Sequence, residues 1–271
     1  MAAKTSGPVR VGIGGWTYAP WRGVFYPEGL AQRRELEFAS RKLKTVEINA
    51  TYHGAQKPES FAKWRDETPD GFVFAVKGPR FAANRRILAE SGESIERFFA
   101  SGVMELKEKL GPVNWQFMAA KQFDPADFEA FLKLLPRRVA GRAIRHAVEV
   151  RHESFRNAEF VALARAHGVA IVVAGESEHP LIADVSAPFV YARLMGAHGD
   201  EPLGYAPKTL DAWAGHARDW AAGAAPKGLA LAAAEVAGAP REVFVYAIAG
   251  HKTANPAAAM ALQARADKAL K

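Results

Sequence analysis

The sequence predicts an α/β protein of the (β/α)8 TIM-barrel type in which the sixth unit is irregular. Eight short apolar runs rich in β-branched residues recur along the chain, and segments with helical periodicity lie between most of them. The chain has 271 residues, the usual size of one such barrel, so a single domain over residues 1–271 is expected. A doubly wound open sheet is the alternative, but no Gly-x-Gly-x-x-Gly fingerprint follows any predicted strand.

The predicted strands are short segments dominated by Val, Ile, Phe and Tyr. Strands of this kind that alternate with helices are typical of a sheet covered by those helices. In chain order they are VRVGIGG (9–15), TVEINA (45–50), FVFAVKG (72–78), VNWQFM (113–118), AVEVRH (147–152), AIVVAG (170–175), FVYARLMG (189–196) and VFVYAIAG (243–250).

The predicted helices are marked by apolar spacing and by capping residues. Asp124 and Asn157 stand at N-cap positions, and Gly168 suits a helix end. Residues 176–188 are too few and too polar for a helix, which makes the sixth unit irregular, and residues 221–240 favour a loop or a loosely specified helix. Helices are expected over residues 29–43, from Pro58, over 93–110, from Pro125, over 157–168, around 210–220 and from Asn255.

The composition excludes several classes of protein. Hydrophobic residues make up 49% and charged residues 24%, which excludes general disorder. The absence of cysteine excludes disulfides, thiolate catalysis and cysteine metal sites. Because the chain has no apolar run of about 18 residues and its start does not resemble a signal peptide, we expect a cytoplasmic protein with no membrane partner. The net charge of +7 favours anionic ligands.

The polar residues of the predicted strands are expected to point into the barrel. Side chains alternate between the two faces of a strand, so Val46 and Ile48 share one face while Glu47 and Asn49 share the other. The bulkier apolar face should pack on the helices. The polar members lie toward the C-terminal ends of their strands, where barrel enzymes build their active sites. The expected site comprises Glu47, Asn49, Lys77, Gln116, Glu149, Arg151, Tyr191 and Arg193.

Further residues are expected to border this site. Arg80 and His152 follow the third and fifth predicted strands, and the first loop is aromatic, with Trp16 and Tyr18 as candidate ligand contacts. A role in capping the core is an equally supported interpretation of that loop. Two carboxylates against three cations leave the site net positive, which suits a phosphate, carboxylate or sulfate group. A structural ion network without chemistry is the competing interpretation.

No metal site is predicted. The sequence has no HExxH or other tight ligand spacing. Possible metal ligands are scattered along the chain: His53, His152, His198 and His251, together with Glu47 and Glu149. The sequence specifies neither a cofactor nor an oligomeric state.

Several motifs resemble those of one protein family. They are GGWTYAPWRGVFYPEGL (14–30), TVEINATYHG (45–54), FAKWRDETPDGFVFAVKGPR (61–80), VEVRHESF (148–155) and YARLMG (191–196). Together they resemble the YecE-like family, also called domain of unknown function 72. The resemblance implies a TIM-type barrel and does not specify a reaction.

The rim of the expected site departs from the pattern of that family. Gln116 is followed by Phe-Met-Ala-Ala where the family has x-Pro-Pro, and Met195 replaces a histidine. Tyr52-His53-Gly54 stands where family members often have Phe-Tyr-Arg. The usual Tyr-Phe-Asn-Asn ending of the eighth strand is Tyr-Ala-Ile-Ala here, at residues 246–249. The acid, amide and basic positions of the predicted site match the family pattern.

Three functions are consistent with these observations. The first is an enzyme acting on a small polar or anionic metabolite by acid/base chemistry, as a hydrolase, lyase or isomerase. In it Glu149 would transfer the proton with Glu47 as its partner, provided that burial raises a carboxyl pKa, and His152 is a further catalytic candidate. The second is a nucleic-acid binding or processing factor, suggested by Arg85-Arg86, Arg137-Arg138 and residues 142–145. The third is a non-catalytic barrel that binds a metabolite.

Overall fold

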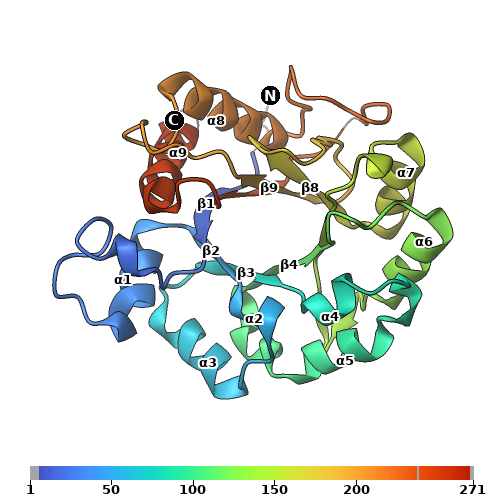
Figure 1. Cartoon of the computed structure of the whole chain (residues 1–271), viewed down its shortest axis with the longest axis horizontal. Coiled ribbons are helices and arrows are strands. Elements are labelled where there is room, and N and C mark those ends of the chain that lie inside the picture. The colour runs from blue at the N-terminus through green and yellow to red at the C-terminus, as the bar shows by residue number, and fades with distance from the viewer. Residues whose placement is uncertain (1–5, 237, 269–271) are drawn as a thin grey trace, which may run out of the picture.

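Eight parallel strands close into a barrel in the computed structural model, which describes residues 6–236 and 238–268. β1 pairs with both β2 and β10, so the sheet has no free edge, as seen down the barrel in Figure 1. This closure confirms the (β/α)8 prediction and rules out the open sheet. The barrel strands are β1 (Val9–Gly14), β2 (Thr45–Ile48), β3 (Val73–Lys77), β4 (Leu110–Gln116), β7 (His146–Glu149), β8 (Ala170–Gly175), β9 (Phe189–Leu194) and β10 (Glu242–Ala247).

The helices form a ring outside the barrel (Figure 1). A separate two-stranded antiparallel hairpin, β5 (Arg138–Val139) and β6 (Arg142–Ala143), precedes β7. The helices are α1 (Glu35–Lys42), α2 (Ala50–His53), α3 (Pro58–Glu67), α4 (Arg80–Ala83), α5 (Gly92–Ala100), α6 (Pro125–Leu134), α7 (Ala158–His167), α8 (Pro207–Ala221) and α9 (Asn255–Lys268).

The predicted capping residues act as expected at two helices. Oδ1 of Asp124 accepts hydrogen bonds from the backbone N–H groups of Ala126 and Asp127 at 3.0 and 3.1 Å. At the start of α7, Oδ1 of Asn157 accepts from the N–H of Phe160 at 2.9 Å. The same helix ends at Gly168, whose φ of 64° lies in the left-handed region that glycine adopts without strain.

The expected helix over residues 93–110 is wrong in extent. α5 ends at Ala100, a 3-10 segment covers Val103–Lys109, and β4 begins at Leu110. Gly102, with a φ of 102°, ends the helix, and the apolar spacing continues across this break. The expected helix over residues 29–43 is shorter too, because a 3-10 turn at Gln32–Arg34 precedes α1. Residues 176–188, and the described residues of 222–241, contain no helix, which confirms the irregular sixth unit and the loop.

The two faces of the barrel strands bury different side chains. Val46, Ile48 and Phe74 belong to the large core that also contains residues of the surrounding helices. Ala75 and Tyr191, of the opposite parity, belong to a separate core built almost entirely from strand residues, which is the barrel interior. The predicted facing of the strands is therefore confirmed, and it directs the polar residues of the same parity inward.

Among the described residues, no helix is both long enough and apolar enough to span a bilayer. Residues 1–5, on which part of the signal-peptide expectation rests, lie outside the described residues.

Candidate functional site

Arg193 occupies the centre of a buried network of charged side chains. It lies on β9 and is 4% exposed, and Glu47 on β2 and Glu149 on β7 are fully buried. Nη2 of Arg193 is 2.9 Å from Oε1 of Glu47. Nη1 of Arg193 donates to Oε2 of Glu149. One guanidinium therefore bridges the two carboxylates that the sequence predicted for the site.

Glu149 is held by two further residues. Nε and Nη2 of Arg151 donate to its Oε1 at 2.9 and 2.7 Å, and Nδ2 of Asn114 donates to its Oε2 at 3.2 Å. Burial by itself would raise the pKa of Glu149, but the positive charges of Arg193, Arg151 and Lys77 outweigh it and lower the pKa to about 2. The expectation of a raised carboxyl pKa is therefore wrong for Glu149, which is ionised at neutral pH.

Glu47 receives a second donor from the barrel interior. The hydroxyl of Tyr191 donates to Oε2 of Glu47 at 2.5 Å. Burial, and then the negative charge of Glu47, raise the pKa of Tyr191 well above its ordinary value. Tyr191 consequently stays a neutral donor, and both oxygens of Glu47 are hydrogen-bonded.

Lys77 is bound differently from the two arginines. Its Nζ donates to Oε1 of Gln116 at 2.5 Å and lies 4.4 Å from the ring centre of Tyr52, and the residue is 6% exposed. Among the described residues no carboxylate lies within ion-pair distance of this amine. Burial lowers the pKa of Lys77 to about 8, although Glu47 acts in the opposite direction. Lys77 is thus the cation of the network whose charge changes near neutral pH.

Two polar atoms of the network have no hydrogen-bond partner among the described residues. They are Nε of Arg193 and Oδ1 of Asn114, and both are buried. A buried donor and a buried acceptor without partners are costly to the folded protein.

The structure brings together seven of the predicted site residues by hydrogen bonds, and places Asn49 beside them. Asn49 directly precedes α2. The side chains of Asn49 and Glu47 both lie against Gly14 of β1: a Cβ atom at Gly14 would be 3.0 Å from Nδ2 of Asn49 and 3.8 Å from Oε1 of Glu47. The linked residues are Glu47, Lys77, Gln116, Glu149, Arg151, Tyr191 and Arg193.

Arg80 and His152 do not join this network. Arg80 is exposed, and its guanidinium lies 5.1 Å from the ring centre of the neighbouring Phe81. Nδ1 of His152 accepts from the N–H of Ser154 at 3.2 Å and caps the 3-10 turn Glu153–Phe155. Arg80 is the first residue of α4, and His152 lies three residues beyond the end of β7, so strand alternation directs neither side chain.

The aromatic first loop packs outside the barrel mouth. The ring of Trp16 meets Trp64 of α3 edge-on at 5.1 Å and also contacts Phe74 on the helix-facing side of β3. Tyr18 packs against the buried Trp21, with Nζ of Lys252 at 4.4 Å over its ring. These contacts support the core-capping interpretation of both residues, and their contact with a ligand stays a prediction.

Three residues near the network were not predicted. Asn114 has the same strand parity as Gln116, so the alternation could have found it. Tyr52 lies in α2, which the sequence did not predict. His179 comes from the irregular sixth unit just after β8, and its pKa is lowered by burial and by the charge of Arg151. Its signal is its position directly after the end of a barrel strand.

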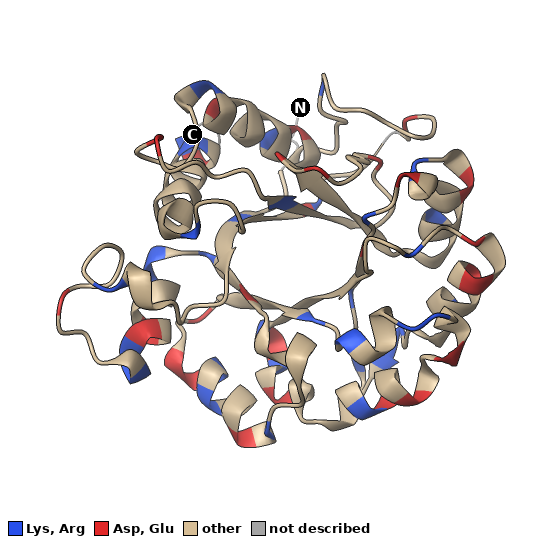
Figure 2. Ribbon diagram, viewed as in Figure 1, with Lys and Arg blue, Asp and Glu red and all other residues tan. Residues whose placement is uncertain are grey.

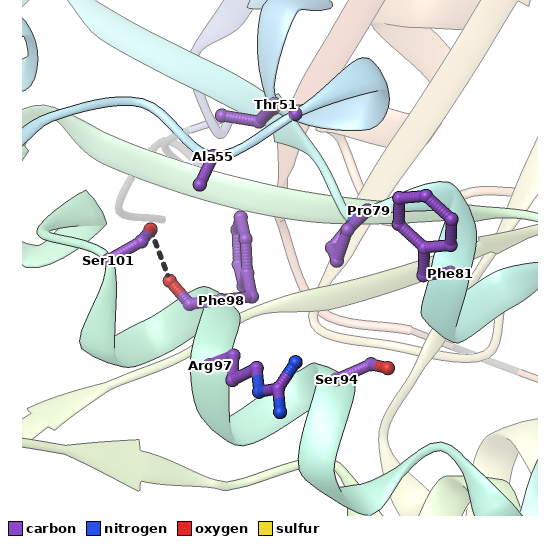
Figure 3. Close-up of a pocket in the computed structure, with 9 residues that line it drawn as sticks. Thr51, Ala55, Pro79, Phe81, Ser94, Arg97, Phe98 and Ser101 are labelled. Atoms are coloured by element: carbon purple, nitrogen blue, oxygen red, sulfur yellow. Dashed lines mark hydrogen bonds between the residues drawn. The ribbon is translucent and has the colours of Figure 1, made fainter.

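A cavity of about 270 Å³ lies between the ends of β2 and β3 and helix α5, and no side chain of the charged network lines it (Figure 3). The ring of Phe98 points from α5 toward the segment of Thr51 and Ala55, and Pro79 and Phe81 line the other side. Oγ1 of Thr51 donates to the carbonyl of Lys77 at 2.7 Å, so this wall adjoins the network. Within the described ranges, no cluster of three or more His, Asp or Glu side chains is placed to hold a metal ion.

Comparison with known sequences finds relatives of one family. The chain is 27% identical over 150 residues to the UPF0759 protein YecE of Escherichia coli K12, a match covering 54% of this chain and 50% of YecE. The YecE protein of Escherichia coli O157:H7 gives the same values. The chain thus spans about half the length of the curated relatives it matches.

Solved structures of two DUF72 family proteins share the fold. The protein from Thermotoga maritima superposes with a TM-score of 0.69 at 23% identity, covering 97% of this chain and 98% of that chain. One from Enterococcus faecalis gives a TM-score of 0.69 at 16% identity, covering 96% and 98%. A family model described as "Protein of unknown function DUF72" matches residues 10–271. This chain therefore belongs to the DUF72 family.

Proposed function

We propose that this chain is an enzyme acting on a small anionic or polar metabolite at the C-terminal mouth of the barrel by acid/base chemistry. The observation that carries the proposal is the position of Arg193. It joins Glu47 and Glu149 in a buried network at the ends of strands, and its Nε has no hydrogen-bond partner in the part of the chain that the structure describes. The C-terminal end of the strands is where barrel enzymes place their reacting groups.

The charge balance of the network favours an anionic ligand. Two carboxylates, Glu47 and Glu149, face three cations, Lys77, Arg151 and Arg193. An unmatched buried charge costs roughly several kcal/mol, so a net positive network is better explained by a ligand carrying negative charge than by stability alone. Guanidinium groups bind carboxylate and phosphate groups with two hydrogen bonds each.

The pKa values assign different roles to the two groups that could move a proton. Glu149, with a pKa near 2, is a poor proton donor or acceptor at neutral pH and instead positions Arg193 and Arg151. Lys77, with a pKa of about 8, exchanges a proton near neutral pH. Glycoside hydrolysis needs one carboxylic acid of raised pKa, and the lowered pKa of Glu149 does not suit that role. A lysine that exchanges a proton near neutral pH suits lyase or isomerase chemistry.

Calorimetric titration with sodium malonate and sodium phosphate tests the anion site. Arg151 is the partly exposed cation of the network, so Arg151→Gln should weaken binding of these anions at least tenfold while the protein stays folded. Arg80→Gln, a charge-matched change outside the network, should leave binding unaltered. Equal losses in the two variants, or no binding by the parent, would contradict the proposal.

The nucleic-acid alternative receives less support from the fold. Arg138 and Arg142 lie on the hairpin that precedes β7, at the N-terminal end of the barrel, whereas Arg85 and Arg86 follow β3 at the opposite end. Lys and Arg residues are spread over the outer helices among Asp and Glu (Figure 2).

A non-catalytic barrel would bind the same anions and turn over none of the substrates offered to it.

A further inference from the structure

We infer that Lys77 is a nucleophile whose Nζ forms an imine with a small carbonyl compound that carries a carboxylate, such as a 2-oxo acid. The inference rests on the proposed function and names its substrate class. It stands on the partners of Nζ, on the positive groups around it and on a comparison with a second buried lysine.

Lys109 shows what a structural buried lysine looks like in this chain. It is 5% exposed, close to the 6% of Lys77. Its Nζ donates to the carbonyls of Arg65 and Thr68 at 2.7 and 2.6 Å and to Oγ1 of Thr68 at 3.1 Å. These three acceptors match the three N–H groups of an ammonium, so the protein satisfies every donor of this lysine.

Nζ of Lys77 has a different set of neighbours at the same burial. Its hydrogen bond goes to Gln116, and Oε1 of Gln116 also accepts from Nη1 of Arg193 at 3.3 Å. The face of Tyr52 covers another side, and Nδ2 of Asn84 holds the Tyr52 hydroxyl at 3.0 Å. An amine with a single acceptor loses little on giving up a proton, and the neutral amine is the nucleophile that imine formation needs.

The surroundings of Lys77 favour both the neutral amine and an acidic substrate. Burial lowers its pKa to about 8, and the charge of Arg193 acts in the same direction. The same Arg193 offers its unpartnered Nε to a ligand carboxylate. A substrate carboxylate bound there would bring the adjacent carbonyl carbon toward Gln116 and Lys77.

The chemical step balances without an added reagent. The neutral amine of Lys77 attacks the carbonyl carbon and a C–N bond forms. The carbonyl oxygen then leaves as water together with both amine protons. The resulting C=N bond, once protonated, withdraws electrons from the neighbouring carbon, which makes proton removal or C–C cleavage there easier.

Reductive trapping tests the imine directly. The parent protein is incubated at pH 8 with pyruvate, reduced with sodium borohydride, digested and mapped by mass spectrometry. At this pH about half of the Lys77 amines are neutral, against less than about 1% of ordinary lysines. We expect the Lys77 peptide to gain the mass of pyruvate less one oxygen, with labelling at least ~10-fold above that of any other lysine.

Four controls make the result decisive. Lys77→Arg should remove the adduct, and Lys109 should stay unlabelled in the folded protein. Both lysines should be labelled equally after denaturation. Acetaldehyde, which is smaller than pyruvate and carries no carboxylate, should label Lys77 less than pyruvate does. If neither pyruvate nor acetaldehyde labels Lys77 more than Lys109 in the folded protein, the inference is overturned.

The trapping and the calorimetry can fail separately. Binding of malonate without trapping would leave the anion site standing and exclude the imine. Trapping with pyruvate and acetaldehyde to the same extent, without malonate binding, would keep the nucleophile and exclude the carboxylate.

Discussion

Nη2 of Arg193 and Oε1 of Glu47 are 2.9 Å apart although their strands, β9 and β2, are not neighbours in the sheet. β10 and β1 lie between them, so this ion pair crosses the interior of the barrel. Since Arg193 also contacts Glu149 on β7, it links three sides of the mouth. The arrangement makes stability and ligand binding depend on the same side chains.

Replacing Arg193 should destabilise the protein strongly. Arg193→Met would leave Glu47 and Glu149 buried without their common partner, and we expect a loss of about 3–5 kcal/mol in the free energy of unfolding measured with urea. Arg34→Met, which removes an exposed pair with Glu37, should change it little. Similar losses in the two variants would show that the buried bridge contributes no more to the free energy of unfolding than an exposed ion pair does.

The stability of the protein should fall in acid partly through Glu149. Its pKa is lowered from 4.5 to about 2 in the folded protein, so the unfolded chain binds the proton more readily. The stabilisation is therefore complete above about pH 4.5 and is lost as the pH falls toward 2. Glu149→Gln should be less stable than the parent protein at pH 7. Between pH 4.5 and 2 its free energy of unfolding, measured with urea, should fall less than that of the parent. A parallel decline in parent and variant would contradict this assignment.

Lys77 should make the stability of the protein rise with pH a second time, in alkali. Its folded pKa of about 8 lies below the ordinary 10.5, so the unfolded chain binds more protons between these values and stability gains from this residue as the pH rises. The full effect is on the order of 3 kcal/mol. Lys77→Met should lack this gain in stability. The free energies of unfolding of parent and variant, measured with urea from pH 8 to 10.5, give the difference. A constant difference would place the pKa of Lys77 in the ordinary range.

The cap of α6 offers a test of the fold away from the site. Asp124→Ala removes the acceptor for two N–H groups and should cost about 1 kcal/mol of stability, whereas Asp124→Asn should retain most of it. Thermal unfolding of both variants measures the difference. Equal melting temperatures for the two would argue against the cap.

The sequence predicted those parts of the site that lie on strands. Strand alternation placed Glu47, Lys77, Glu149 and Arg193 together because a closed parallel sheet turns one parity of every strand toward the same interior. Arg80, His152 and Trp16 lie two or three residues beyond the ends of their strands, where the alternation weakens as a guide to side-chain direction. Arg151, two residues past the end of β7, still joins the network as predicted. The helix break at Gly102 escaped prediction because the apolar spacing continues across it.

The direction of the Glu149 pKa shift could not be predicted from the sequence either. Burial and three cations act on this carboxyl in opposite directions, and only their distances decide which prevails. His179 escaped because it lies in an irregular segment whose path follows no periodicity.

A crystal structure of the parent protein soaked in sodium malonate tests the central claim most directly. The proposal predicts density for malonate in the barrel mouth, with a carboxylate against Nε of Arg193 and within reach of Arg151. Density confined to exposed arginines such as Arg80, with the mouth free of malonate, would contradict it.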